Sequence, residues 1–207
     1  MNEPLAQIVH LVDDDEAIRD ALGWLLRSRG VASQAWDSGE AFLRDYSASM
    51  RGCLLLDVRM TGMTGLELFE KLLAHGCNMP ILFLTGHADV PMAVKALKHG
   101  AFDFLEKPFN DNELVDRVLE ALLVAARQQG RDADRDGIAA RLAALTERER
   151  DVMHLILAGK LNKVIADELG IAMRTVEVHR SHAFAKMKVR SAVELAQLLA
   201  GYRQGNV

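Results

Sequence analysis

The chain has 207 residues, of which 50% are hydrophobic and 26% charged, a composition typical of globular proteins with one or two domains. It has no apolar run near the roughly 18 residues of a membrane span, no basic and apolar secretion signal at its start, and too few cysteines for a disulfide framework. We therefore expect a cytoplasmic protein that does not enter a membrane.

The overall charge of −4 conceals an asymmetry between the two parts of the chain. Residues 1–122 carry 11 basic and 19 acidic side chains, whereas the remainder carries 14 basic and 10 acidic ones. A basic second part is compatible with binding to a polyanion, although an ordinary solvated surface can carry the same charge.

Short apolar runs alternate with amphipathic stretches over the first 125 residues. The expected strands are 8–12, 31–36, 53–56, 80–84 and 102–105. The expected helices are 16–28, a second that opens at 38–40, a third that follows the loop 61–65, a fourth through Val94, and a fifth over 112–126. Strands that alternate with helices predict parallel βαβ units, so the fold class is α/β with a doubly wound parallel sheet.

Residues 126–141 are polar, with two glycines and mixed charges, and we interpret them as a linker that can continue the fifth helix. From Leu142 onward the pattern is helical only. The predicted organisation is therefore an α/β domain over 1–125, a linker over 126–141, and a small all-α domain of four helices over 142–207.

Polar residues stand at the carboxyl ends of four predicted strands. Asp13 and Asp14 follow the first, Asp57 ends the third, Thr85 follows the fourth, and Lys107 follows the fifth. In doubly wound sheets this edge is where ligands bind. A single acid there is explained as a helix cap, but the whole set is not.

This set of side chains suits phosphoryl transfer to a carboxylate. Clustered carboxylates require a cation, and Mg²⁺ prefers oxygen ligands. An aspartate can act as the nucleophile and form an aspartyl phosphate, while a lysine and a threonine hydroxyl contact the phosphoryl oxygens. The sequence Lys107-Pro108 is compatible with a cis peptide bond.

In order and spacing, Asp13-Asp14, Asp57, Thr85 and Lys107-Pro108-Phe109 resemble the receiver domain of two-component response regulators over residues 5–125. The resemblance implies that Asp57 accepts a phosphoryl group from a histidine kinase. It implies that Mg²⁺ or Mn²⁺ is held by Asp14, Asp57, the backbone carbonyl of Arg59 and, through water, Asp13, with no other cofactor. It also implies that Thr85 and Phe104 form a switch pair, which must work by packing because Phe104 has no hydroxyl.

Two departures from the receiver pattern concern the loops beside the pocket. The family usually has proline four residues after the phosphoacceptor, where this chain has Thr61, so we expect a more flexible loop. Arg59 and His87 occupy positions that in the family tune the lifetime of the phosphate.

The second domain has the pattern of a DNA-binding helix pair. A capping box at Thr146–Glu149 opens one helix, 162–169 is a short helix stopped by Gly170, and 173–188 is a longer helix with small and polar residues on its outer side. The pattern alone is equally compatible with a four-helix cap that has solvated lysines.

Several motifs resemble the LuxR-type helix-turn-helix over residues 142–200: Leu145–Glu149, Asn162-Lys163, Leu169–Ile171 and Thr175–Arg180. The resemblance implies that 173–188 is the recognition helix. Glu177, Val178 and Ser181 would then face base edges. The residues that would hold phosphates are Lys163, Arg174, Thr175, Arg180 and Lys186. Ala172 replaces the usual serine N-cap, a loss of about 1 kcal/mol.

The stretch 86–94 together with Glu106–Phe109 is similar to the FixJ-type branch. This similarity implies a transcription activator that works with a sensor histidine kinase, promoter DNA and RNA polymerase. It also implies a homodimer that forms on phosphorylation through helix four and strand five. The residues expected on that face are Val90, Pro91, Val94, Lys95, Lys98 and Phe104, and for Val94 a place in the core is the preferred interpretation.

Two other functions are compatible with parts of the sequence. One is a DNA-binding regulator that no longer depends on phosphorylation, against which the complete acidic set argues. The other is a Mg²⁺-dependent aspartyl-phosphate phosphohydrolase, which would need a second aspartate where this chain has Arg59. We therefore expect no enzymatic activity beyond self-phosphorylation and autodephosphorylation at Asp57. Trp24, Trp36, His10 and both cysteines are interpreted as packing residues.

Overall fold

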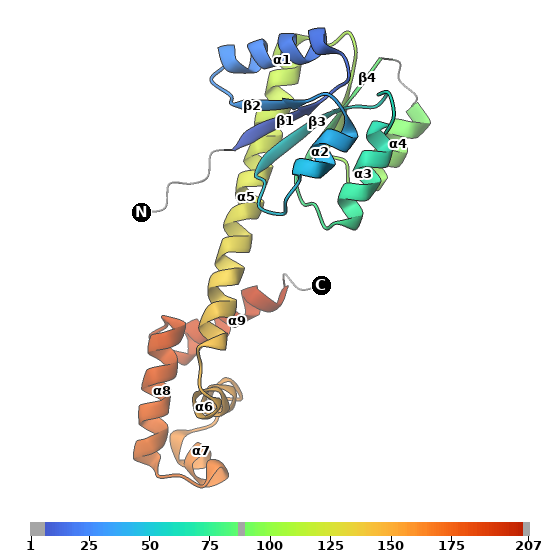
Figure 1. Cartoon of the computed structure of the whole chain (residues 1–207). Coiled ribbons are helices and arrows are strands. Elements are labelled where there is room, and N and C mark those ends of the chain that lie inside the picture. Colours follow the sequence, from blue (N-terminus) through green and yellow to red (C-terminus); the bar gives the residue numbers. More distant parts are fainter. Residues whose placement is uncertain (1–6, 87–89, 205–207) are drawn as a thin grey trace. The chain divides into compact units, whose positions relative to one another are not determined.

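The computed structural model describes residues 7–86 and 90–204, and the contacts between residues divide the chain into two compact units at Gln129 and Gly130. The first unit contains a single five-stranded parallel sheet (Figure 1). Its strands are β1 (Ile8–Val12), β2 (Ser33–Trp36), β3 (Gly52–Asp57), β4 (Ile81–Thr85) and β5 (Asp103–Glu106). The strand order is β2-β1-β3-β4-β5, so the predicted doubly wound α/β fold is confirmed.

Helices cover both faces of the sheet because neighbouring residues on each strand point to opposite sides. On β3, Leu55 packs with side chains of α1 (Glu16–Ser28) and of the first turns of α5 (Asp111–Ala143). Leu54 and Leu56 lie on the other face of the sheet. They pack there with side chains of α2 (Gly39–Asp45), α3 (Gly65–Ala74) and α4 (Val90–Lys98). Both faces of β3 are buried, which is why its sequence is a continuous apolar run rather than an alternating one.

The helix α5 extends over Asp111–Ala143, beyond the expected 112–126, so the fifth helix continues through the linker as the sequence allowed. The stretch that we interpreted as a linker is helical throughout, including Gly130 and Gly137. Glycine weakens a helix interior by about 1 kcal/mol relative to alanine, so Gly130 and Gly137 oppose the helix that the alanines, arginines and glutamines around them favour.

The second unit contains four further helices around one core. They are α6 (Glu147–Leu157), α7 (Asn162–Leu169), α8 (Met173–Met187) and α9 (Ala192–Gln204). Gly170 joins α7 to α8 in the left-handed conformation, with φ of 63°, and so allows the tight turn of a helix-turn-helix. Val176, Ala183 and Met187 face the core of this unit, as the sequence predicted. No side chain caps α8 at Ala172.

Two packing predictions are wrong. Trp24 is 71% exposed, because α1 buries Leu22, Leu25 and Leu26 and turns Trp24 away from them. Val94, for which we preferred a place in the core, is 43% exposed. Trp36 and the two free cysteines are buried as expected.

Candidate functional site

Three carboxylates meet at the carboxyl edge of the sheet. Asp13 and Asp14 follow β1, and Asp57 is the last residue of the neighbouring strand β3. One oxygen from each of the three lies within 4.8 Å of the other two. Asp13 and Asp57 are buried, whereas Asp14 is exposed. These residues lie together, as we expected from their places at strand ends, although Asp14 and Asp57 are 43 positions apart in the chain.

Lys107 supplies the cation of this cluster. Its Nζ donates to Oδ2 of Asp13 at 2.8 Å and to Oδ1 of Asp57 at 2.7 Å. Lys107 follows β5, its backbone N–H donates to the carbonyl of Thr85, and its peptide bond to Pro108 is cis. Burial by itself lowers the pKa of Lys107, but the hydrogen bonds and charges of Asp13 and Asp57 together raise it. One ammonium thus faces three carboxylates, which leaves a surplus of negative charge.

Asp57 is held at both oxygens. Oδ1 contacts Lys107, and Oδ2 accepts a hydrogen bond of 2.8 Å from the backbone N–H of Arg59. Burial raises the pKa of Asp57 and the charge of Asp13 adds to this, while Lys107 and the Arg59 N–H oppose it. Behind it, a Cβ at Gly65 would collide with the carbonyl oxygen of Asp57, so α3 can start this close to β3 only with glycine there.

Asp14 is held differently from the other two acids. Its Oδ2 accepts two hydrogen bonds from Thr61, one of 2.7 Å from the backbone N–H and one of 2.8 Å from the hydroxyl. These two bonds lower the pKa of Asp14 and so favour its ionised form. With three carboxylate oxygens this close together, the acidic cluster offers the oxygen ligands that a hard divalent cation prefers.

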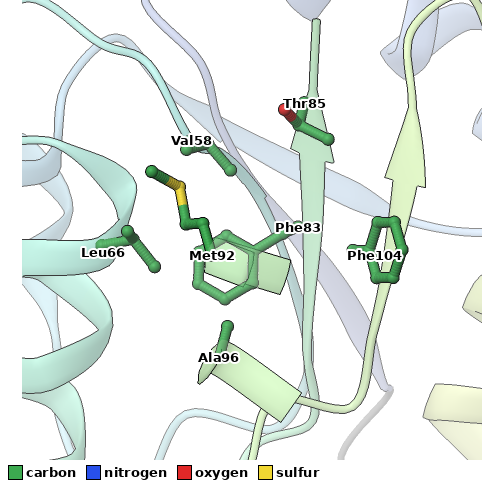
Figure 2. A pocket seen from close by; sticks show the side chains of 7 residues that line it. All are labelled: Val58, Leu66, Phe83, Thr85, Met92, Ala96 and Phe104. Atoms are coloured by element: carbon green, nitrogen blue, oxygen red, sulfur yellow. The ribbon is translucent and has the colours of Figure 1, made fainter. Parts of the chain in front are cut away.

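Thr85 and Phe104 line one small cavity beside this edge. The cavity, of about 20 Å³, has room for roughly one water molecule. Figure 2 shows Thr85 on β4 and Phe104 on the adjacent β5, with Phe83 and Met92 among the other lining side chains. Thr85 is buried and Phe104 partly buried. A change in the packing of either side chain therefore changes the shape of this cavity.

On the expected dimer face, Val94, Lys95 and Lys98 are exposed. The side chains of Val90 and Pro91, and all of His87, lie outside the described residues.

The predicted outer side of α8 is exposed in the second unit. Glu177, Val178 and Ser181 are exposed, and Arg174 has 88% of its side chain exposed with only a 3.6 Å contact to Glu177. Lys163 is also exposed, whereas Thr175 is half-buried. Within this unit, Lys163, Arg174, Glu177, Val178 and Ser181 are therefore exposed rather than packed into its core.

Arg180 and Lys186, in contrast, are already engaged within the unit. Arg180 donates to Oδ1 of Asn162 at 3.2 Å and lies over the ring of Phe184. The Nζ of Lys186 donates to Oε2 of the buried Glu149 at 2.6 Å and to the carbonyl of Ala144 at 3.1 Å.

Comparison with known proteins assigns both units. Residues 9–119 match the response regulator receiver domain, and residues 143–199 match the bacterial regulatory proteins of the luxR family. The C4-dicarboxylate transport transcriptional regulatory protein DctR of Rhodobacter capsulatus is 53% identical over 92% of this chain and 98% of its own length. The chain belongs to the response regulators of two-component systems.

Other relatives support the same branch. The transcriptional regulatory protein FixJ of Azorhizobium caulinodans is 47% identical over 93% of this regulator and 92% of its own length. The solved structure of the response regulator StyR is similar with a TM-score of 0.90 and 41% identity, covering 96% of this chain and all of StyR. These are transcription regulators rather than typical enzymes, and none of the regulator's described helices is long and apolar enough to span a bilayer.

Sequence reasoning missed two contacts of the response regulator. We noted Thr61 only as a departure from the family, although it is the partner of Asp14. We noted Glu149 only as a capping residue, although it also binds Lys186. Neither contact has a signal in the local pattern, since the partners are 47 and 37 positions apart.

Proposed function

We propose that Asp57 accepts a phosphoryl group from a sensor histidine kinase, and that this event controls binding of promoter DNA by α8. The observation that carries the proposal is the cluster at the edge of the sheet. A buried aspartate lies between Lys107 and the Arg59 N–H, in a pocket with two further carboxylates. We assign residues 1–125 to the receiver, 126–141 to the linker, and 142–207 to the DNA-binding domain.

In the proposed reaction, a carboxylate oxygen of Asp57 forms a bond to phosphorus as the bond between phosphorus and the kinase histidine breaks. Asp14, Asp57, the carbonyl of Arg59 and, through water, Asp13 would hold Mg²⁺ or Mn²⁺, which would supply positive charge for the phosphoryl oxygens. Lys107 moves its ammonium from the carboxylate to a phosphoryl oxygen, and the hydroxyl of Thr85 donates to another. Autodephosphorylation at Asp57 is the only other reaction that we propose.

Thr85 and Phe104 form the switch in this proposal. Movement of Thr85 toward the phosphoryl group enlarges the small cavity that both residues line, and the ring of Phe104 then moves into it. The change alters the exposed face formed by α4 and β5, where we place the homodimer contact around Val94, Lys95 and Lys98. Dimerisation brings two copies of α8 to a near-palindromic site.

On DNA, we assign base contacts to Glu177, Val178 and Ser181, and phosphate contacts to Lys163, Arg174, Thr175, Arg180 and Lys186. We further propose that the regulator activates transcription in the cytoplasm, where it meets promoter DNA and RNA polymerase. Glu177 can accept a hydrogen bond from the amino group of cytosine.

The proposal is tested by treating the full-length protein with acetyl phosphate, or with beryllofluoride, in the presence of Mg²⁺. We expect the mass in solution to rise from monomer to dimer and the affinity for its own upstream DNA to increase. The Asp57→Asn variant is the control, because it retains the shape of the side chain but cannot be phosphorylated. If the wild-type protein and this variant respond alike, the switch proposal fails.

A further inference from the structure

Thr61 makes an unusual double contact to the one exposed acid of the pocket. Both the N–H and the hydroxyl of Thr61 donate to the same oxygen, Oδ2 of Asp14, at 2.7 and 2.8 Å. Asp14 and Thr61 are both exposed, so in the absence of these bonds the Asp14 side chain would exchange among rotamers in water. Two short bonds to one oxygen fix the carboxylate in a single orientation.

We propose that Thr61 is a positioning residue that orients Asp14 for a divalent cation before the cation binds. This inference rests on the proposed function, in which Asp14 is a metal ligand. Asp13 and Asp57 each accept one hydrogen bond from a backbone N–H and one from the ammonium of Lys107, whose positive charge opposes the arrival of another cation. Asp14 is oriented by neutral donors, which fix the carboxylate without opposing the metal's charge.

The two hydrogen bonds together affect metal affinity in two opposite ways. The larger of these effects decides whether Thr61 raises or lowers that affinity. The bonds withdraw some charge from Oδ2, which weakens a metal bond to that oxygen. However, a carboxylate has two oxygens with about four lone-pair positions, so Oδ1 stays open for a ligand bond. Ordering the side chain in advance removes an entropic cost that metal binding would otherwise carry. We therefore assign Thr61 a net favourable effect on cation affinity.

A series of substitutions at this position separates the two donors. Thr61→Ser retains both the N–H and the hydroxyl. Thr61→Val has nearly the same shape but loses the hydroxyl, and Thr61→Pro loses both donors because proline has no N–H. We expect serine to bind Mg²⁺ as the wild-type protein does, valine to bind about threefold more weakly, and proline about tenfold more weakly, the range expected for loss of one ordered side chain.

The experiment titrates the full-length protein with MgCl₂ alone, without any phosphoryl donor, and follows tryptophan fluorescence. Direct counting of free Mn²⁺ by electron paramagnetic resonance gives a second measure of affinity. Thr64→Val is the matched control in the same loop: it removes the hydroxyl that caps α3 but has no bond to Asp14, so Mg²⁺ affinity should not change. Circular dichroism checks that each variant is folded, and the serine and valine variants decide the outcome if the proline variant is not.

Equal or tighter Mg²⁺ binding by the valine variant would overturn the inference, since Thr61 would then be neutral or would compete with the metal. If the wild-type protein is phosphorylated on Asp57 while the Thr61 series is flat, only this inference fails. If the wild-type protein binds neither Mg²⁺ nor Mn²⁺, the metal-assisted reaction under the proposed function fails as well.

Discussion

Each unit of the regulator contains one lysine bound to a buried carboxylate, yet the two clusters differ in their balance of charge. In the receiver, Lys107 is shared between Asp13 and Asp57, and Asp14 lies in the same group of acids. In the DNA-binding domain, Lys186 pairs with Glu149, whose side chain is only 4% exposed. The first cluster has three acids around one ammonium, whereas the second has one acid that contacts Lys186 and lies 3.8 Å from the ring of His182.

We propose that the first cluster is the reactive site, and that the second stabilises the fold of the DNA-binding domain. Glu149 also closes the capping box of α6 by accepting from the backbone N–H of Thr146, so its hydrogen-bonding capacity is used within the domain. Asp13, Asp14 and Asp57 instead place three carboxylate oxygens close enough to share a cation from solution.

Removing the ammonium of Lys107 should have the largest effect, which is on the rate of phosphorylation. For Lys107→Ala we expect phosphorylation by acetyl phosphate to slow by roughly 10²-fold, the effect of losing one charge-stabilising donor in a transition state. The rate is measured by separation of the phosphorylated and unmodified protein over time. Lys71→Ala, which removes an exposed lysine of α3, is the control. A Lys107→Ala protein that reacts at the wild-type rate would refute the role of Lys107.

Removing the negative charge of Glu149 should affect the stability of the fold instead. Glu149→Gln leaves Lys186 without its charged partner and should lower the free energy of unfolding by about 2 kcal/mol. The hydrogen bond from Lys186, followed by that from the Thr146 N–H, lowers the pKa of Glu149. A carboxyl group with a lowered folded pKa stabilises the fold fully above its ordinary value of 4.5 and loses that effect as pH falls through the folded pKa.

Urea unfolding of the full chain, followed by circular dichroism, therefore has a definite pH dependence. The difference between wild type and Glu149→Gln should be full at pH 7 and disappear in acid. Glu147→Gln, in the same helical turn but exposed, is the control and should change little. A difference that grows in acid would contradict the sign of the pKa shift.

A smaller effect is expected for an exposed basic residue of α8, Arg174. Arg174 is almost fully exposed, whereas Lys186 is held by Glu149. Arg174→Ala should weaken DNA binding about equally for all sequences and reduce the slope of log affinity against log salt by about 1. Binding isotherms at several salt concentrations measure this slope. An unchanged slope would remove Arg174 from the set of phosphate contacts.

His10 offers a third and smaller case, a buried titratable group whose contacts within the described residues are to a carbonyl and two aromatic rings. Nε2 hydrogen-bonds the carbonyl of Arg51, and the ring packs near Trp36 and Phe42. Burial lowers the pKa of His10, and the Arg51 carbonyl only partly opposes this. The unfolded chain therefore binds the proton more readily, so stability should fall as pH drops below 6.5.

The slope attributable to His10 is at most about 1.4 kcal/mol per pH unit. His10→Gln retains a donor for Arg51 but does not titrate, so the slope between pH 7 and 5.5 should become shallower. Unfolding curves at both pH values measure it, and an identical slope in the variant would contradict the assignment.

Much of the fold could be predicted because local signals and tertiary packing agree. The bounds of α1 and α7 were predicted from caps and apolar spacing, and Asp15 caps α1 by accepting from the Ala17 N–H. Strand ends differ by one or two residues. The length of α5 was underestimated because polar residues and glycines favour a linker, while the alanines, arginines and glutamine between them favour a helix.

The candidate site divides in the same way. We predicted that Asp13, Asp57 and Lys107 share one edge of the sheet because each lies at the carboxyl end of a strand. In the structure, Lys107 contacts both acids. The engagement of Asp14 by Thr61 and of Lys186 by Glu149 could not be predicted, because each depends on the three-dimensional approach of two loops or helices. The exposure of Trp24 was missed because its position on α1 was judged by residue type rather than by helical face.

The most direct test of the account locates the phosphoryl group itself. The full-length regulator is incubated with acetyl phosphate and Mg²⁺, the acyl phosphate is trapped by borohydride reduction, and the modified peptide is sequenced by mass spectrometry. The account predicts modification at Asp57, about one group per chain, and none when Mg²⁺ is chelated. Modification at another residue, or none at all with Mg²⁺ present, would contradict it.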